Sequence, residues 1–176
     1  MRLRELEREE LSDLWSIDRA EVVENIYYHE GGRLVLKPEH YDMKGWPDGE
    51  PEHYAPMLLD CFDRGGKACG AFDGTILVGA SVLESRLIGD RDQLQLKFLH
   101  VSQKARKSGL GRRLFELAAS QARELGASRL YISATPTENT VNFYLHLGCA
   151  VTAHIDEALF QLEPKDIHLE FQLPVP

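Results

Sequence analysis

The sequence predicts an α+β (mixed α/β) domain, in which a mixed sheet carries helices on its faces. Two β-rich runs around Asp73-Gly74, a strong two-residue turn signal, lead into a third run that ends at Val101. A long helical pattern and another short β-rich run follow, which is the order of a strand-helix-strand crossover. The 176 residues, 43% of them hydrophobic, suit a single domain with a substantial core.

Alternating and helix-spaced runs predict the elements of the first third of the chain. The predicted elements are a strand over Arg2–Glu7, a helix over Arg8–Arg19, strands over Val22–His29 and Arg33–Lys37, an ordered loop over Pro38–Pro51 and a helix over Glu52–Asp63. Glu30-Gly31-Gly32 joins the two strands as a hairpin, and Arg64-Gly65-Gly66 ends the helix.

The middle of the chain predicts an antiparallel meander and then the crossover. The predicted strands are Lys67–Phe72, Thr75–Leu87 and Arg91–Val101, with a second turn at Gly89-Asp90. An apolar helix face from Leu110 to Leu125 ends at Gly126. The next strand, Arg129–Ser133, is expected to lie parallel to Leu94–Val101, because such crossovers are right-handed.

A helix-start signal follows that strand. Thr135 can cap the helix, Pro136 takes its first position, and Glu138 lies three residues after the cap. This helix is expected to end near Leu147, before Gly148. The remaining predicted elements are a strand over Val151–Ile155, a helical turn over Ala158–Leu162 and a last strand over Ile167–Leu173.

Composition excludes several classes of protein. The net charge of -8 argues against a general nucleic-acid binder, and no apolar run approaches the roughly 20 residues of a membrane span. The segment Met1–Leu6 lacks the apolar stretch of a signal peptide. Three cysteines without a C-x-x-C pair predict reduced thiols in a cytoplasmic protein. The seven histidines lack metal-ligand spacing, so no metal site is expected.

The segment Lys104–Arg113 is basic and contains glycine, in a chain that is otherwise acidic. Its cations are Lys104, Arg106, Lys107, Arg112 and Arg113, and it holds no acid. Gly109 and Gly111 let the backbone approach a ligand, and the following helix begins with free amides. This predicts a site for a phosphate-bearing anion. The segment is neither a Rossmann fingerprint, since Leu114 holds the third glycine position, nor a P-loop.

Two patterns here resemble the GCN5-related N-acetyltransferase (GNAT) family. The run Arg106-Lys107-Ser108-Gly109-Leu110-Gly111 matches that family's R/Q-x-x-G-x-G/A signature. The run from Asn139 through Phe143-Tyr144 to Gly148 resembles its next motif. The resemblance covers roughly Lys67 to Val151.

The resemblance implies a GNAT-type fold and acetyl-coenzyme A (acetyl-CoA) as co-substrate. The implied sheet is mixed and mostly antiparallel, has about six to seven strands, and is splayed between the fourth and fifth core strands. Within the single domain 1–176, residues 1–66 would form a variable acceptor side, 67–151 the acetyl-CoA-binding core and 152–176 a C-terminal strand region. The implied cofactor-binding residues are Leu99, His100, Val101, Arg106, Lys107, Ser108, Gly109, Leu110, Gly111, Arg112 and Asn139. Lys104 or Lys107 could reach the 3'-phosphate.

Catalysis must solve two proton problems. An amine like that of lysine has a pKa near 10.4, so only about one in 2,500 is neutral at pH 7. The resemblance implies Tyr144 as general acid for the departing thiolate. Glu84 is a candidate base, although it could instead pair with Lys97 across the strands. His100 and a water-mediated path remain alternatives.

The acceptor is expected to be a small-molecule amine, with a protein amine as the alternative. Candidate pocket residues before the core are Glu24, Tyr27, Tyr28, Tyr41 and Trp46. A non-catalytic coenzyme A-binding regulatory or sensor module shares these patterns and is the alternative function. A homodimer is plausible for this family.

Overall fold

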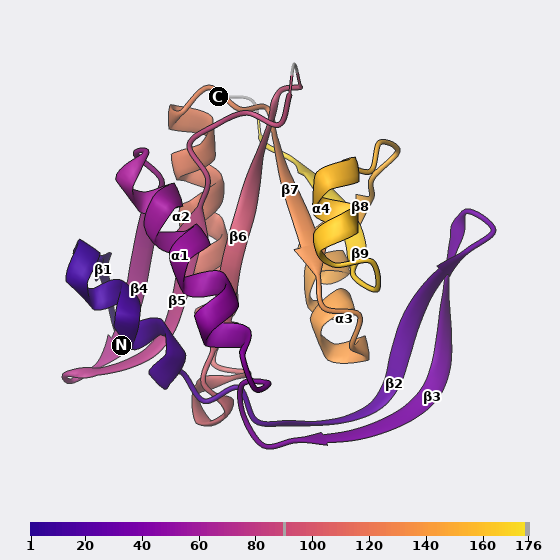
Figure 1. The fold of residues 1–176 in the computed structure, drawn as a ribbon, viewed down its shortest axis with the longest axis horizontal. Helices are drawn as coiled ribbons and strands as arrows, with labels where there is room; N and C mark the ends of the chain where they lie inside the picture. Colours follow the sequence, from indigo (N-terminus) through magenta and orange to yellow (C-terminus); the bar gives the residue numbers. More distant parts are fainter. Residues whose placement is uncertain (90, 175–176) are drawn as a thin grey trace.

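The chain folds around a seven-stranded sheet with helices on both faces and a separate two-stranded arm, in a computed structural model that describes residues 1–89 and 91–174 (Figure 1). The strand order in the sheet is β1-β4-β5-β6-β7-β9-β8, and β2 pairs with β3 in the arm. The strands are β1 (Arg2–Glu5), β2 (Glu21–Glu30), β3 (Arg33–Met43), β4 (Lys67–Asp73), β5 (Ile76–Leu83), β6 (Gln93–Val101), β7 (Arg129–Ala134), β8 (Ala150–Val151) and β9 (Ile167–Gln172). The α-helices are α1 (Glu50–Asp63), α2 (Leu110–Glu124), α3 (Glu138–His146) and α4 (Glu157–Leu162), and the 3₁₀ helices are η1 (Arg8–Ser16) and η2 (Gln103–Ala105).

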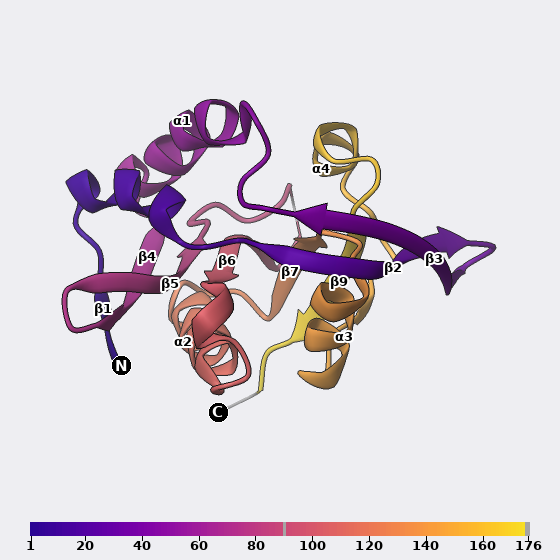
Figure 2. The ribbon, with the colours of Figure 1, turned by 90° about the horizontal axis from the view of Figure 1, so that it is seen from below.

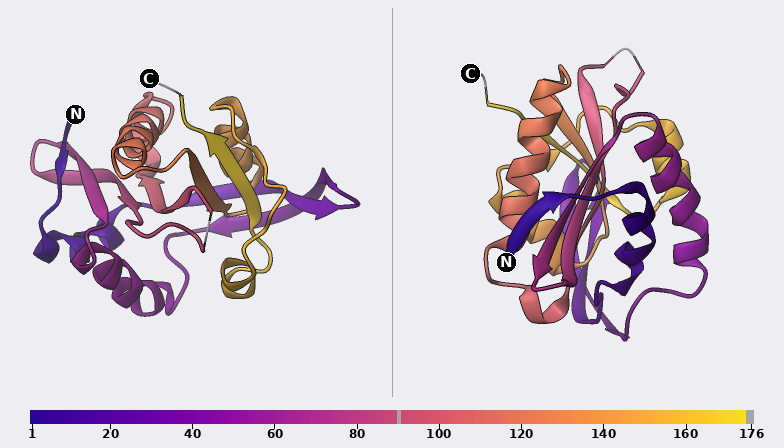
Figure 3. Two further views of the ribbon diagram at one scale, coloured as in Figure 1. Left: turned by 90° about the horizontal axis from the view of Figure 1, so that it is seen from above. Right: turned by 90° about the vertical axis from the view of Figure 1, so that its left-hand side faces the viewer.

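The helices form one layer on each side of the sheet. Helices α2 and α3 lie on one face, whereas η1, α1 and α4 lie on the other (Figures 2 and 3). The apolar spacing predicted for α2 is used for packing, since Leu114 and Ala118 are completely buried. On the opposite face, Leu14 of η1 is equally buried. Each helix layer therefore has its own core against the sheet.

The splay between β6 and β7 is present. These strands are parallel, as the crossover predicts, but they pair only over Gln93–Gln95 and Arg129–Tyr131. Beyond that point β6 stays paired with β5 as far as Val101, and β7 stays paired with β9 as far as Ala134. The two strands therefore diverge toward their carboxyl ends, as Figure 1 shows. The meander β4-β5-β6 is antiparallel, as predicted.

The hairpin is longer than the sequence predicts. Gly31 and Gly32 both have positive φ values, 57° and 78°, which suit a tight turn of type I′. Strand β3 then runs on to Met43, through a segment predicted to be loop. Pro38 is tolerated because the arm is only two strands wide, so its nitrogen can face away from the partner. The arm projects beyond the sheet (Figures 1 and 2).

Several boundaries differ from the predictions. The N-cap of α3 is Thr137 rather than Thr135, because the Pro136 carbonyl lies outside the helix and accepts the Tyr27 amide of the arm at 2.8 Å. Strand β5 ends at Leu83. Residues 8–16 form a 3₁₀ helix, shorter than the helix predicted there, and β8 is limited to residues 150–151. The turn predicted at Gly89-Asp90 includes a residue outside the described ranges.

The helical turn α4 and the last strand β9 match their predictions closely. Cys61, Cys69 and Cys149 are buried free thiols. Within residues 1–89 and 91–174, no helix is long and apolar enough to span a membrane.

Candidate active site

A cavity of about 770 Å³ opens where β6 and β7 separate. Strand β6 and the segment that continues β7 contribute one wall, and the arm, α1 and the region from α4 to β9 contribute the others. The residues on the first wall are Gln95, Lys97, Phe98, His100, Ser133, Thr135, Pro136 and Thr137. The cavity therefore includes the divergent strand ends at which the resemblance predicts chemistry.

The loop before α2 has the backbone geometry of an anion site. Lys107 and Gly109 both have positive φ, 61° and 81°, which turns successive amides toward one side. In the described part of the chain, the amides of residues 107–112 donate to no protein acceptor. Gly109 is the N-cap of α2 and supplies no side-chain cap, so the helix N-terminus stays open. These amides can bind a pyrophosphate.

Arg106, one of the implied cofactor-binding residues, does not offer its backbone amide to a ligand. That amide donates to the Gln103 carbonyl at 3.3 Å. Its guanidinium donates to the carbonyls of Val101 and Ala20 at 3.0 and 2.9 Å. Arg106 therefore ties the loop to the end of β6 and the start of the arm, and the free amides begin at Lys107.

The end of β6 offers an edge for a ligand. Leu99, His100 and Val101 pair with β5 on one side, while β7 has already diverged on the other. Gly111 lets α2 pack closely against α3 beside this strand, since a Cβ there would lie 3.2 Å from the Phe143 ring and 3.9 Å from Val101. An extended chain such as pantetheine can pair along this edge.

The other predicted cofactor residues lie near this loop. Lys104, Lys107, Ser108 and Arg112 are exposed. Leu110 is buried and contributes only its backbone to the loop. The side-chain amide of Asn139, in the first turn of α3, donates to Glu21 at 2.8 Å and therefore already has a protein partner.

The Tyr144 ring is buried between α2 and α3. It is 6% exposed, and its centroid lies 6.1 Å from that of Phe115 and 5.1 Å from that of Phe143. The Tyr144 hydroxyl has no hydrogen-bond partner among the described residues. In the same ranges, the fully buried side-chain atoms without a partner belong to Gln93 and His168, so the Tyr144 hydroxyl is not fully buried and keeps some access to solvent. Burial raises the pKa of this phenol, and the nearby Cys149 and Asp166 raise it further.

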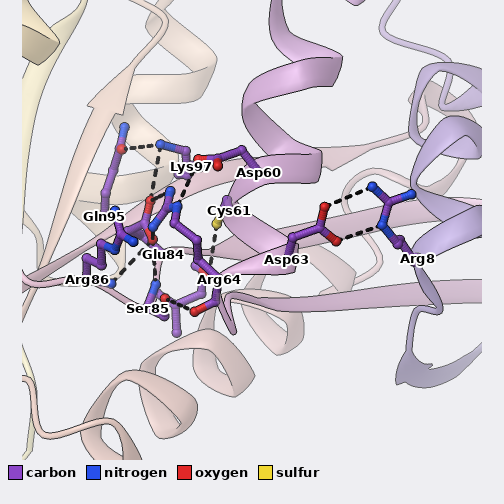
Figure 4. A network of polar contacts seen from close by, with 11 residues as sticks. Arg8, Asp60, Cys61, Asp63, Arg64, Glu84, Ser85, Arg86, Gln95 and Lys97 are labelled. Carbon is purple, nitrogen blue, oxygen red and sulfur yellow. Dashed lines mark hydrogen bonds and ion pairs between the residues drawn. The ribbon is translucent and has the colours of Figure 1, made fainter.

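Glu84 lies in an ion-pair network on the α1 side of the sheet (Figure 4). Its carboxylate accepts two hydrogen bonds from Arg64, at 2.6 and 2.9 Å, and Lys97 lies 3.5 Å away. Burial alone would raise its pKa, but the bonds from Arg64 and the Ser85 amide outweigh burial and lower the pKa to about 2. Glu84 does not line the cavity. A carboxylate bound in this way is not available as a general base. The alternative, an ion pair with Lys97, is present, but Arg64 is the closer partner of Glu84.

We expect Glu84→Gln to destabilise the fold by roughly 1.5–3 kcal/mol without changing kcat, because it weakens charge-assisted bonds to Arg64. The folded-state pKa is depressed, from 4.5 to about 2. The wild type should therefore lose its advantage over the variant as pH falls from about 4.5 toward about 2. Denaturant unfolding at several pH values measures this difference. A large loss of kcat with unchanged stability would restore Glu84 as a base.

His100 lies in the cavity wall, although its surroundings disfavour a charge. Its ring centroid lies 4.8 Å from that of Trp46 and 4.7 Å from that of Phe98. Burial lowers its pKa to about 3, and the nearby Arg19 and Arg106 add to this effect. The ring is therefore neutral at physiological pH and a very weak base.

The acceptor-side aromatics gather as predicted. Tyr27, Tyr28 and Tyr41 from the arm and Trp46 from the following loop all line the cavity. Glu24 does not, because its carboxylate pairs on the exposed surface of the arm with His40 at 3.1 Å.

The sequence did not reveal the acidic residues of the cavity. Glu39 lies in β3, Glu50 begins α1, and Glu163 and Asp166 lie between α4 and β9. The cations that line the same cavity are Arg19, Lys97 and Lys165. Burial raises the pKa of Glu163, and the Glu50 carboxylate adds to the effect. The charged turn Glu163-Pro164-Lys165-Asp166 was visible in the sequence, but only the pairing of β9 with β7 brings it to the splay.

Solved structures with the same fold include several acetyltransferases. Nourseothricin acetyltransferase has 20% identity and a TM-score of 0.72, over 98% of each chain. A candidate streptothricin acetyltransferase from Bacillus anthracis strain Ames, solved with acetyl coenzyme A, has 16% identity and a TM-score of 0.69, over 97% of this chain and 98% of that one. Aminoglycoside 6'-acetyltransferase type Ii has 19% identity and a TM-score of 0.65 over the whole of both chains.

At these identities the structural likeness establishes a shared fold. No curated protein sequence matches the chain significantly. A family model, described as the acetyltransferase (GNAT) family, matches residues 2–149 and so covers most of the chain. This confirms the resemblance drawn from the glycine loop and the Asn139–Gly148 segment, and with it acetyl-CoA as the co-substrate. The chain belongs to the GNAT family of N-acetyltransferases.

Proposed function

We propose that this N-acetyltransferase acetylates a primary amine on a small cationic molecule, by direct transfer while both substrates are bound. The observation that carries the proposal is a cavity that joins the splay of β6 and β7 to walls on which carboxylates outnumber cations. The carboxylates are Glu39, Glu50, Glu163 and Asp166, and the cations are Arg19, Lys97 and Lys165. An ammonium substrate is attracted to such carboxylates. The net charge of -8 adds to this attraction at longer range. Two proteins of similar fold are a nourseothricin acetyltransferase and an aminoglycoside 6'-acetyltransferase, which supports a small-molecule acceptor.

The residues on the acetyl-donor side fit acetyl-CoA. In the proposal, the free amides of residues 107–112 bind the pyrophosphate, and the open edge of Leu99–Val101 pairs with the pantetheine arm. Arg112 and Lys107 supply positive charge at the surface, and Asn139 contacts the cofactor from the first turn of α3. Acetyl-CoA supplies an acetyl thioester, which this arrangement directs into the cavity.

Tyr144 is proposed to assist the departing sulfur. The raised pKa of the buried phenol makes complete proton transfer harder, and a hydrogen bond to the developing thiolate then carries much of the effect. The hydroxyl has no protein partner in the described ranges, so it is free to donate. The cysteines do not suit a covalent intermediate, because they are buried and burial raises the pKa of Cys149 to about 12. Direct transfer needs no such intermediate.

The direct test is release of thiol when the protein and acetyl-CoA meet a panel of small amines. We expect turnover with polyamine-like and aminosugar acceptors, and much less with neutral or anionic amines. Equilibrium binding of acetyl-CoA should be measured in parallel. Binding of acetyl-CoA without turnover on any amine would contradict the proposal and favour a coenzyme A-binding regulatory module.

A further inference from the structure

Asp166 lies at the point where β6 and β7 have separated. The residue sits in the short connection from α4 to β9 and lines the cavity. Its Oδ2 accepts a hydrogen bond from the Ser133 hydroxyl at 2.8 Å. Ser133 belongs to β7 but lies beyond Tyr131, the last β7 residue that pairs with β6. The carboxylate is thus anchored to the divergent end of the strand, beside the space that the thioester would enter.

This carboxylate has no ion-pair partner within 4.0 Å among the described residues, although it is partly buried. The nearby cation, Arg19, pairs instead with Glu50 at 2.5 Å. Glu163 and Glu50 are the other charged neighbours that influence it. Taking a carboxylate partly out of water without a cation costs free energy, and a cationic ligand at this position would offset that cost.

Asp166 lies near enough to Tyr144 for its charge to act on the phenol, although Tyr144 is not among the residues that line the cavity. The Asp166 charge contributes to the raised pKa of Tyr144. Tyr144 approaches from α3 on one face of the sheet, whereas Asp166 comes from the loop after α4 on the other. An acid and a base on either side of the splay is the arrangement that aminolysis of a thioester needs.

We propose that Asp166 is the general base that accepts the proton of the acceptor's ammonium group, and that Ser133 positions it. The proposal rests on the proposed function and assigns the base within it. Glu84 is committed to Arg64, and His100 is a very weak base, so neither competes for the role. Of the cavity acids, only Asp166 is tethered to β7.

The proton and electron balance is complete with Asp166 and Tyr144 alone. Asp166 takes one proton from the ammonium, which frees the nitrogen lone pair to form the C–N bond. The C–S bond breaks, and its electron pair leaves with sulfur, to which the Tyr144 hydroxyl donates a hydrogen bond. The nitrogen then loses its second proton, which reaches the sulfur through that hydroxyl and leaves Tyr144 protonated. Asp166 releases its proton to solvent, so one proton is produced for each acetyl group transferred.

The pKa of Asp166 suits this task. Burial raises the pKa to about 6; the Ser133 hydroxyl opposes the rise, and Glu163 and Glu50 favour it. The carboxylate is then mostly ionised at pH 7, yet it is a stronger base than an ordinary aspartate, whose pKa is near 3.9.

The first test is the Asp166→Asn variant. We expect kcat/KM to fall by about 10²-fold or more, with unchanged affinity for acetyl-CoA measured by calorimetry. The acid limb of the wild-type pH profile, expected near pH 6, should disappear in the variant. Formate added to Asp166→Ala should restore part of the rate, which a purely structural role would not allow.

Two neighbouring substitutions provide a matched pair with opposite expected effects. Ser133→Ala removes a bond to the ionised carboxylate, so it should raise the Asp166 pKa and move the acid limb to higher pH. Glu163→Gln removes a neighbouring negative charge, so it should lower the pKa and move the limb to lower pH. Carbon-13 NMR titration of the Asp166 carboxyl measures the same shifts without any turnover.

The outcomes separate this inference from the proposed function. A wild type that turns over amines, together with an Asp166→Asn variant of equal rate and unchanged acid limb, would overturn the assignment of Asp166 alone. Shifts in the same direction for Ser133→Ala and Glu163→Gln would also overturn it. A wild type that binds acetyl-CoA but acetylates no amine would overturn the proposed function itself.

Discussion

Removal of the Tyr144 hydroxyl by Tyr144→Phe is expected to lower kcat by about 10²-fold, because proton donation to a leaving group typically contributes this much or more. The affinity for acetyl-CoA should stay the same, since the ring and its packing against Phe115 and Phe143 are kept. Steady-state kinetics with a responsive amine measures the first effect, and calorimetric titration measures the second. A variant with the wild-type rate would remove Tyr144 from the mechanism.

Tyr131→Phe is the matched control for this variant. Tyr131 is also buried, but its hydroxyl lies 2.7 Å from His168 Nδ1 and accepts the Asp156 amide at 3.1 Å. Its removal leaves buried partners unsatisfied and should destabilise the fold by about 1–3 kcal/mol, with little change in kcat. Tyr144→Phe should cost little stability, because its hydroxyl has no protein partner in the described ranges. Equal effects of both variants on stability and on rate would contradict the distinction.

The acetyl-donor side of the site was predictable because it is encoded locally. The strand that ends at Val101, the glycine turn and the amphipathic α2 are contiguous in sequence, and the handedness of the crossover fixes where the next strand goes. Turn chemistry and helix periodicity therefore predicted the open, glycine-containing start of α2, and with it a candidate anion site, without any knowledge of distant contacts.

The acceptor side was less predictable because it depends on contacts between distant segments. The role of Glu84 could not be inferred, since its main partner Arg64 comes from the end of α1. The N-cap of α3 moved from Thr135 to Thr137 because the arm takes up the Pro136 carbonyl. The role of Glu84 and the start of α3 were mispredicted for the same physical reason: a tertiary hydrogen bond overrides a local preference.

For the same reason, the sequence did not indicate Asp166 as a site residue. In the sequence it is one acid in a short charged turn before the last strand. It reaches the splay only because β9 pairs with β7 on the side away from β6, and this brings Ser133 opposite His168, two residues beyond Asp166. The fold thus places Asp166, from the C-terminal region, beside the divergent end of β7, from the middle of the chain.

Substitution of Gly109 by valine is expected to weaken acetyl-CoA binding by roughly 10- to 100-fold. Gly109 has a φ of 81°, which a β-branched residue adopts only under strain, so the loop should relax and turn its amides away from the pyrophosphate. Loss of one hydrogen bond to a charged group costs about 1.5–3 kcal/mol, which corresponds to this change in affinity. Equilibrium titration with acetyl-CoA measures the effect in the absence of any acceptor.

Gly126→Val provides the control from the other end of the same helix. Gly126 follows α2 with a φ of 90°, and neither glycine has another atom within 4 Å of the position a Cβ would take, so the two substitutions introduce backbone strain without steric overlap. Both variants should lose a similar amount of stability, about 1–2 kcal/mol, because the left-handed conformation costs this much for a residue with a side chain. Only Gly109→Val should lose affinity for acetyl-CoA. If the two variants bind acetyl-CoA equally well, the amides of residues 107–112 do not form the pyrophosphate site.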